Sequence, residues 1–157
     1  MSFLTFLMDQ ERSPEAQTEA FRQKIREFQQ KFPDDDTLAG VKDLNEIDGT
    51  EIVMWEEFRS IVEQMKILIE SYRDKTENKA SPTRKEMYEK IKNFVQKLQT
   101  FMAEAQGKNQ NSKADFYAWV LNRITPAMND VQLLDVLNEQ ELDFILSEIN
   151  QEIENTK

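Results

Sequence analysis

The chain has 157 residues, of which 39% are hydrophobic and 32% are charged, and its formal net charge is −10. The absence of Cys excludes disulfides and thiolate metal sites, and the absence of His excludes imidazole zinc sites and His-dependent catalytic triads. Because Gly (3) and Pro (4) are scarce, long helices are favoured over a sheet with many hairpins. We therefore expect an all-α fold, with residues 1–157 forming a single-domain helical bundle.

The first twelve residues, MSFLTFLMDQER, form an apolar N-terminal segment that includes Phe3, Leu4, Phe6 and Leu7. No basic residue precedes the apolar run, and the run is too short for a signal peptide or a membrane span. We therefore expect a cytoplasmic protein that does not contact a membrane. In such a protein this segment either packs across the bundle or docks into another protein.

The first long helix is predicted from Pro14 to about Lys31, because Ser-Pro-Glu supplies an N-cap, a first-turn proline and a first-turn acid. Pro33 ends it. A second helix is predicted from about Thr50 to Asp74 by a wide apolar face. Three apolar residues fall outside that face, which is typical of a central or interface helix: Ile52, Val53 and Ile67.

A third helix is predicted from Ser81-Pro82 to about Gln106, with Gly107 as its left-handed terminator. Its apolar residues form a seam of about two heptads, which we expect to pack inside the bundle. A capping box at Ser112–Asp115 opens a fourth helix, which Thr125-Pro126 is expected to end. A short helix over 130–137 and a last helix capped by Asn138 complete a prediction of five main helices and one short one.

Residues 42–58, KDLNEIDGTEIVMWEEF, are similar in composition to an EF-hand calcium loop. If Gly49 is the sixth loop residue, Trp55 occupies the twelfth, where a bidentate Glu belongs. If Asp43 is the first, Ile47 occupies the fifth, where an oxygen ligand belongs. We therefore interpret the stretch as an Asp-Gly turn that opens a helix with an acid in its first turn, and we expect no metal and no cofactor.

Charge is unevenly distributed along the chain. Residues 1–73 contain 9 Lys/Arg and 16 Asp/Glu, residues 74–123 contain 10 and 6, and residues 124–157 contain 1 and 8. The basic region 74–123 either pairs with acids of neighbouring helices or contacts a polyanion or an acidic partner. The candidate contact residues are Arg84, Lys85, Lys90, Lys92, Lys97, Lys108 and Lys113.

A second set of candidates consists of apolar residues outside the predicted helix stripes. Trp119 and Phe144 lie beside the apolar faces of their helices, where they either complete the core or contact a partner. Aromatic residues are enriched at protein interfaces. Together with the N-terminal segment and the second helix, the candidates for protein contact are Phe3, Leu4, Phe6, Leu7, Ile52, Val53, Ile67, Trp119 and Phe144.

The sequence contains no phosphate-binding Gly-rich loop, and no carboxylate pair is marked by an apolar pocket. The leading hypothesis is a non-enzymatic helical subunit or adaptor that acts through protein–protein contacts within a larger assembly, with homo-oligomers also possible.

Two alternatives involve nucleic acid as a secondary partner. In the first, the chain is a small helical subunit of a nucleoprotein complex whose region 74–123 contacts a nucleic-acid backbone. Small subunits of RNA-guided CRISPR effector complexes share this general size and helicity, an analogy at the level of class only. In the second, the chain is an acidic inhibitor that mimics nucleic acid with its 1–73 and 124–157 surfaces.

Overall fold

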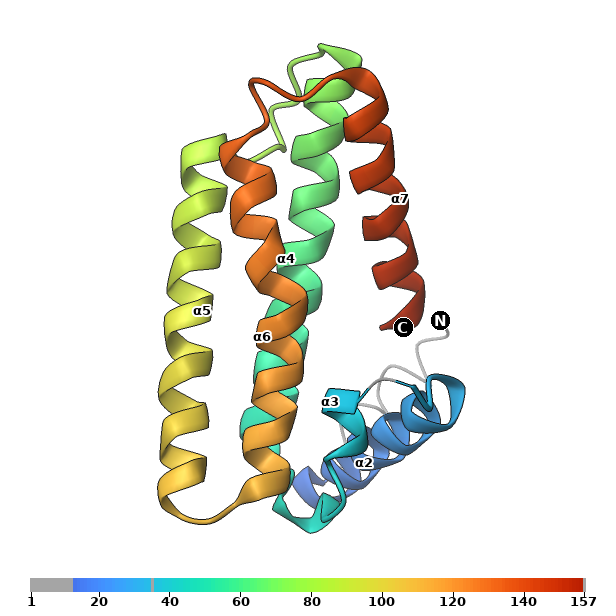
Figure 1. Cartoon of the computed structure of the whole chain (residues 1–157), viewed down its shortest axis with the longest axis vertical. Coiled ribbons are helices and arrows are strands. Elements are labelled where there is room, and N and C mark those ends of the chain that lie inside the picture. The colour runs from blue at the N-terminus through green and yellow to red at the C-terminus, as the bar shows by residue number, and fades with distance from the viewer. Residues whose placement is uncertain (1–12, 35, 157) are drawn as a thin grey trace.

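The computed structural model describes residues 13–34 and 36–156 (Figure 1). Over these residues the chain is helical and has no strand, which confirms the expected all-α fold. Five long helices pack as one bundle, with a four-residue helix and a short 3₁₀ turn between the first two. The elements are α2 (Pro14–Lys31), α3 (Asp36–Ala39), the 3₁₀ turn (Leu44–Glu46), α4 (Gly49–Asp74), α5 (Arg84–Gly107), α6 (Asn111–Gln132) and α7 (Glu139–Asn155).

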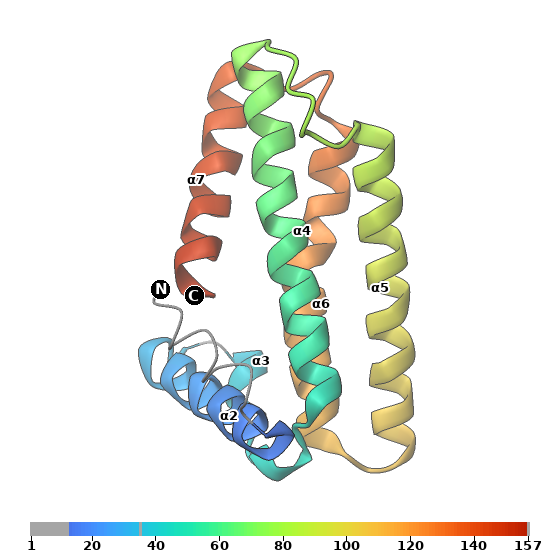
Figure 2. The same cartoon turned by 180° about the vertical axis from the view of Figure 1, so that it is seen from behind.

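Helices α4, α5, α6 and α7 run along the long axis of the molecule, and α2 crosses their lower end (Figure 1). Helices α4 and α6 lie in the middle, one behind the other, with α5 and α7 on opposite sides (Figures 1 and 2). Helix α5 forms a close antiparallel hairpin with α6, whereas α7 packs chiefly on α4. Because α7 is short, it covers only the upper part of α4, and α2 and α3 lie below its C-terminal end (Figure 1).

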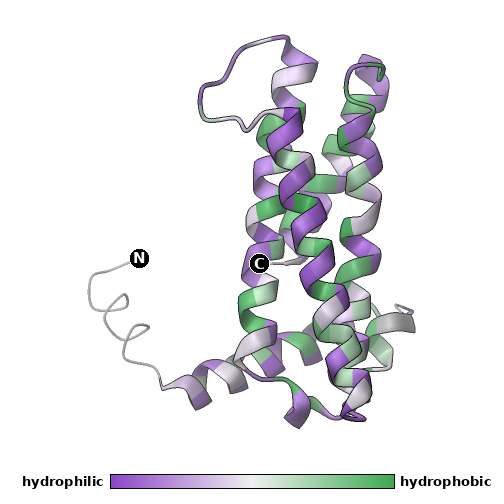
Figure 3. Cartoon of the chain, turned by 90° about the vertical axis from the view of Figure 1, so that its left-hand side faces the viewer, coloured by the Kyte–Doolittle hydropathy of each residue, from purple (hydrophilic) through white to green (hydrophobic). Residues whose placement is uncertain are grey.

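Helix α2 has the bounds that the sequence predicts. The Ser13 hydroxyl accepts a hydrogen bond from the Ala16 N–H at 3.2 Å, and Pro14 occupies the first turn. Hydrophilic residues occupy most of the outward-facing helix surfaces in Figure 3, and apolar ones turn toward neighbouring helices. In α2 the buried stripe is Phe21, Ile25 and Phe28.

The stretch with EF-hand-like composition forms the N-terminal cap of α4. The Asp48 carboxylate accepts a hydrogen bond from the Thr50 N–H at 2.9 Å, and the Glu51 carboxylate accepts one from the Asp48 N–H at 2.9 Å. This reciprocal arrangement is a capping box. The predicted Asp-Gly turn that opens a helix with an acid in its first turn is therefore confirmed. Asn138 and Glu141 form a second capping box at the start of α7, also as predicted.

Helix α6 continues through Pro126, so the prediction that it ends there is wrong. Ile124, Ala127 and Val131 are buried on its inner face, and their packing outweighs the hydrogen bond that proline cannot donate. The prediction of a separate short helix over 130–137 is also wrong. Its first residues belong to α6, and turns follow. The single short α-helix among the described residues is α3.

The ends of α5 differ from the prediction. The N-cap is Thr83, whose hydroxyl accepts a hydrogen bond from the Glu86 N–H at 3.1 Å, and not Ser81. Gly107 is the last helical residue, and the left-handed conformation falls on Asn109 (φ 58°). Asparagine tolerates this conformation better than most residues, so it serves in place of glycine.

The prediction that Ser112 caps α6 is wrong, because Ser112 lies within the first turn of that helix. It is buried, and its hydroxyl accepts hydrogen bonds from the N–H groups of Lys42 (3.1 Å) and Asp43 (2.9 Å). The backbone N–H groups of this loop have no helical or sheet partner, and a distant helix supplies an acceptor for them. Ser112 thereby fixes the loop that leads into α4.

We expect Pro126→Ala to raise the free energy of unfolding by about 1–3 kcal/mol, because alanine can donate the missing helical hydrogen bond at an exposed position. Chemical denaturation measures the change. Pro14→Ala is the matched control, since Pro14 is in the first turn of α2, where a proline loses no hydrogen bond. A fall in stability on Pro126→Ala would contradict this account of α6.

Candidate functional site

Four of the seven basic candidates have polar partners within the chain. The closest contacts are Arg84–Asp135 (2.6 Å), Lys90–Gln64 (2.8 Å), Lys97–Glu57 (3.1 Å) and Lys113–Asp48 (2.8 Å). These contacts agree with the interpretation that basic residues pair with acids and polar groups of neighbouring helices. Lys85, Lys92 and Lys108 are exposed and form no ion pair with the residues that the structure describes. Only these three remain as candidates for contact with a polyanion.

The apolar candidates for protein contact differ in exposure. Val53 on α4 and Phe144 on α7 are 57% and 64% exposed, so both are available to a partner. Ile52 and Ile67 are half-buried. The four candidates in the apolar N-terminal segment lie outside the described residues.

Trp119 is 2% exposed, so it completes the core, which is the first of the two alternatives, and it is not available to a partner. Helix α2 crosses α6 at this point, and Phe28 packs on Trp119 with a centroid distance of 5.1 Å. The Arg123 guanidinium lies 4.3 Å from the same ring centroid. Apolar periodicity predicts one buried face for α6, but α2 also covers a second face of that helix, where Trp119 lies.

A groove of about 310 Å³ lies between α6 and α7, with α4 at its base. Helix α6 packs mainly on α5 and α7 on α4, so the two rims are not closed on each other. Small side chains at Pro126 and Ala127 leave space on the α6 side. The apolar residues that line the groove are Phe58, Val62, Met65, Ile124, Ala127, Ile145 and Ile149.

Two carboxylates on opposite rims of this groove have no cationic partner among the residues that the structure describes. Burial raises the pKa of Asp130, and the nearby Glu148 carboxylate raises it further. Neither acid forms an ion pair with the described residues. At the other end of the groove, Arg123 and Glu152 neutralise each other in an ion pair. The groove therefore has an apolar base and one acidic end that favours a cation.

A buried polar cluster joins the start of α4 to α6. The Lys113 ammonium lies 2.8 Å from an Asp48 oxygen and 3.3 Å from a Glu51 oxygen, and Glu51 is fully buried. Burial raises the pKa of Glu51, as does its hydrogen bond with Asp48. Burial alone would raise the pKa of Asp48, but hydrogen bonds from Lys113 and neighbouring groups hold it well below its ordinary value. Burial, together with the Glu51 charge, also raises the pKa of Tyr117.

Perturbed pKa values often mark catalytic sites, but catalysis also requires access for a substrate. Glu51 has no exposed surface, and Tyr117 is likewise fully buried. We therefore interpret this cluster as a structural connection between α4 and α6. The sequence analysis predicted that an acid, which is Glu51, would lie in the first turn of α4. It gave no signal for Lys113 as its partner, because the two residues are far apart in the chain.

Comparisons with protein-family models, with curated proteins and with solved structures found no match. Within the described residues, no helix combines the length and apolar character that crossing a bilayer requires. In the same part of the chain, no three acidic side chains come together in an arrangement that could hold a metal ion.

The lowered pKa of Asp48 predicts a pH-dependent contribution to stability. Because the pKa is below its ordinary value of 3.8, the charged carboxylate stabilises the fold above that pH, and this contribution is lost as the pH falls through and below it. Asp48→Asn keeps a good N-cap but removes the charge. We expect the variant to unfold at lower denaturant than wild type at pH 7, with a clearly smaller difference at pH 3. An equal difference at both pH values would show that charge is not the cause.

Proposed function

We propose that this protein is a non-enzymatic helical subunit or adaptor that binds a basic, amphipathic segment of a partner protein in the groove between α6 and α7. The observation that carries this proposal is a pair of carboxylates, Asp130 and Glu148, at the rim of an apolar groove, neither of which forms an ion pair with the described residues. A Lys or Arg placed between them would relieve their mutual repulsion. Aliphatic side chains of the same segment would lie on the apolar base of the groove.

The size of the groove suits one face of a short helix. A cavity of about 150 Å³ holds one benzene-sized group, so 310 Å³ accommodates about two side chains of that size. Amphipathic helices present such anchors at spacings of three or four residues. The turn after α6 adds exposed apolar side chains at Leu133 and Val136, close in sequence to Asp130. A partner segment would therefore meet apolar surface and negative charge together.

The two nucleic-acid alternatives have less support. Most of the basic candidates, including Arg84 and Lys97, are engaged by groups of this chain, which leaves few cations for a phosphate backbone. An acidic mimic of nucleic acid would present carboxylates, but it would have no use for an apolar groove base. A protein partner with a basic and apolar face accounts for both features of the groove.

A labelled helical peptide of Leu and Arg tests the proposal by fluorescence anisotropy, with a peptide of Leu and Glu as its counterpart. We expect the basic peptide to bind, and we expect its affinity to fall as salt is added, because salt screens exposed charges. The double variant Asp130→Asn, Glu148→Gln should bind at least about tenfold more weakly, since each removes a charge-assisted contact. It should remain as stable as wild type, because it removes a repulsion rather than an ion pair.

The matched control is Glu104→Gln, Glu139→Gln, which removes the same charge from exposed positions that do not line the groove. It should change the affinity by less than about twofold. Equal losses in the two double variants would show that only net charge matters. Equal binding of the two peptides would contradict the proposed basic partner.

A further prediction concerns Lys85, Lys92 and Lys108. We expect the wild-type protein to bind no single-stranded DNA or RNA at about 150 mM salt, because its net charge is −10 and only three of the seven basic candidates lack a polar partner among the described residues. Gel-shift or anisotropy titration measures this directly. Strand binding that the triple Lys→Gln variant abolishes, with a flatter dependence on salt, would instead support the nucleoprotein alternative.

A further inference from the structure

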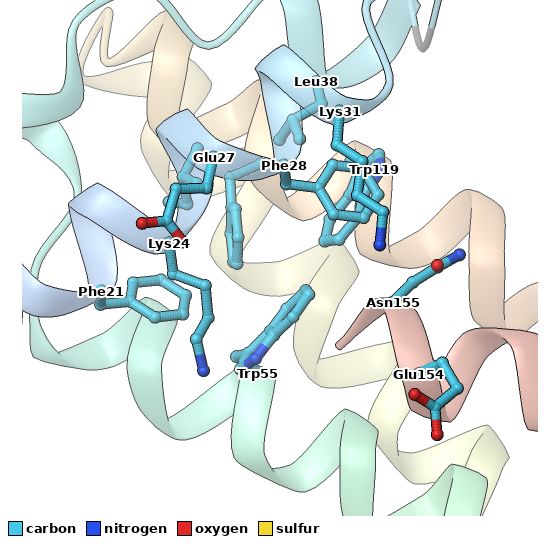
Figure 4. A pocket seen from close by; sticks show the side chains of 12 residues that line it. Phe21, Lys24, Glu27, Phe28, Lys31, Leu38, Trp55, Trp119, Glu154 and Asn155 are labelled. Atoms are coloured by element: carbon cyan, nitrogen blue, oxygen red, sulfur yellow. The ribbon is translucent and has the colours of Figure 1, made fainter. Parts of the chain in front are cut away.

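The aromatic pocket at the lower end of the bundle, where α2 crosses α4 and α6, has a volume of about 160 Å³ (Figure 4). Four of the rings that form its wall are Phe21, Phe28, Trp55 and Trp119. Its charged lining residues are two cations and two acids, Lys24, Lys31, Glu27 and Glu154. Because these charges balance, they give the pocket no preference for a cationic or an anionic ligand.

The groove between α6 and α7 differs from this pocket because acids outnumber cations on its walls. Its charged lining residues are Asp130, Glu148, Glu152 and Arg123. Arg123 and Glu152 pair with each other, whereas neither Asp130 nor Glu148 forms an ion pair with the described residues. Helices α6 and α7 run in opposite directions (Figure 1), so the ion pair marks the lower end of the groove and the two remaining acids mark its upper end. The groove is therefore negative at one end and neutral at the other.

The cation at the lower end is held in place by aromatic rings. The Arg123 guanidinium lies 4.3 Å from the ring centroid of Trp119 and 4.9 Å from that of Phe28. Cation–π contacts of this kind are attractive, and the ion pair with Glu152 adds to them. Asp130 lies two turns further along α6, which is about 10 Å along the helix axis. Arg123 is thus kept away from Asp130, and the difference in charge between the two ends is built into the fold.

The peptide dipoles of α6 add to the negative charge at the upper end. Asp130 lies in the last turn of α6, which ends at Gln132. The last turn of a helix carries a partial negative charge, because its carbonyl groups lack helical donors. Helix α7 begins near this end with the opposite partial charge, but Glu141 in its first turn offsets that charge. The upper end of the groove therefore favours a positive group.

The length of the groove sets the length of the segment that it holds. The lining residues that lie farthest apart on each helix are separated by seven positions: Phe58 and Met65 on α4, Arg123 and Asp130 on α6, and Ile145 and Glu152 on α7. Seven residues span about 10 Å, which is two helical turns. A partner helix therefore places two turns in the groove, and its residues at spacings of three, four and seven face the same side.

On the basis of the function proposed above, we propose that the groove binds its partner helix in one direction, with the N-terminal end of the partner at Asp130 and Glu148. The motif that the groove recognises is a basic residue followed by apolar residues three or four and seven positions later. In this direction the basic side chain and the partially positive N-terminus of the partner both lie at the negative end, and the apolar side chains lie over Phe58 and Val62. In the opposite direction the partially negative C-terminus of the partner would lie beside the two acids. The partner helix therefore runs antiparallel to α6.

Two helical peptides of identical composition and reversed order test this direction. The forward peptide has an Arg followed by Leu residues four and seven positions later, and the reverse peptide has the same residues in the opposite order. Both carry a hydrocarbon staple on the solvent-facing side, because a basic residue in the first turn would otherwise lower the helix content of the forward peptide. Acetylated and amidated ends remove the terminal charges. In anisotropy titrations against the full-length protein, we expect the forward peptide to bind about fivefold more tightly.

A nitroxide label on the peptide reports the direction itself. Attached at the N-terminal end of the forward peptide, the label should broaden the amide signals of Asp130 and Ile145 more than those of Arg123 and Glu152 in a ¹H–¹⁵N spectrum. Attached at the C-terminal end, the label should do the opposite. The same order of broadening from both labels, or the reversed pattern, would overturn the proposal.

The double variant Asp130→Asn, Glu148→Gln removes the negative end and should reduce the difference between the two peptides to less than about twofold. Its matched control, Glu63→Gln, Glu104→Gln, removes the same charge from exposed positions outside the groove and should keep the difference. If the wild-type protein binds both peptides equally well, the proposed function stands and the proposed direction is wrong. If the wild-type protein binds neither peptide, both the function and the direction are wrong.

Discussion

The stacking of Trp55 against Trp119 is the contact on which the lower half of the molecule depends. The two rings lie 5.1 Å apart at an interplanar angle of 13° and join α4 to α6. Phe21 and Phe28 of α2 pack edge-on against these rings, at 6.0 and 5.1 Å. Each such pair contributes about 0.5–1.5 kcal/mol beyond the burial of its surface. The narrow apolar stripe of α2 therefore packs on this stack, and Phe21 also contacts Phe116 of α6.

The same junction determines where the molecule is left open. Helix α2 covers the lower end of α4 and α6, and the short α7 covers the upper end of α4. Neither α2 nor α7 packs closely on the side of α6 that faces α7. The groove and the aromatic pocket therefore have the same origin. Helices α2 and α7 are each too short to cover the whole length of α4 and α6, so space remains beside each of them.

Ion pairs are distributed unevenly around the bundle. On the closed side of the bundle, cations and acids meet across helices, as in the contacts of Lys97 with Glu57 and of Lys113 with Glu51. On the open side, Arg123 pairs with Glu152 at one end of the groove, whereas at the other end Asp130 and Glu148 repel each other and form no ion pair with the described residues. Exposed ion pairs contribute little to stability, and a pair of like charges opposes it.

The sequence by itself determined the fold class, the five main helices and the N-caps of α2 and α7. These features are local: Ser13 and Asn138 cap their helices through residues three positions away, and apolar periodicity determines which face turns inward. The N-terminal start of α4 at an Asp-Gly turn followed in the same way from neighbouring residues.

Only the tertiary structure decided which contacts form between distant helices. It carried α6 through Pro126, buried Trp119 beneath α2 and turned Ser112 from a predicted cap into a partner for a loop. It also left the indole N–H of Trp55 without an acceptor among the described residues and brought Asp130 close to Glu148. Periodicity specifies the direction of a side chain around its own helix axis, but not the angle or height at which another helix crosses. Those two quantities determine which side chains meet and where space remains.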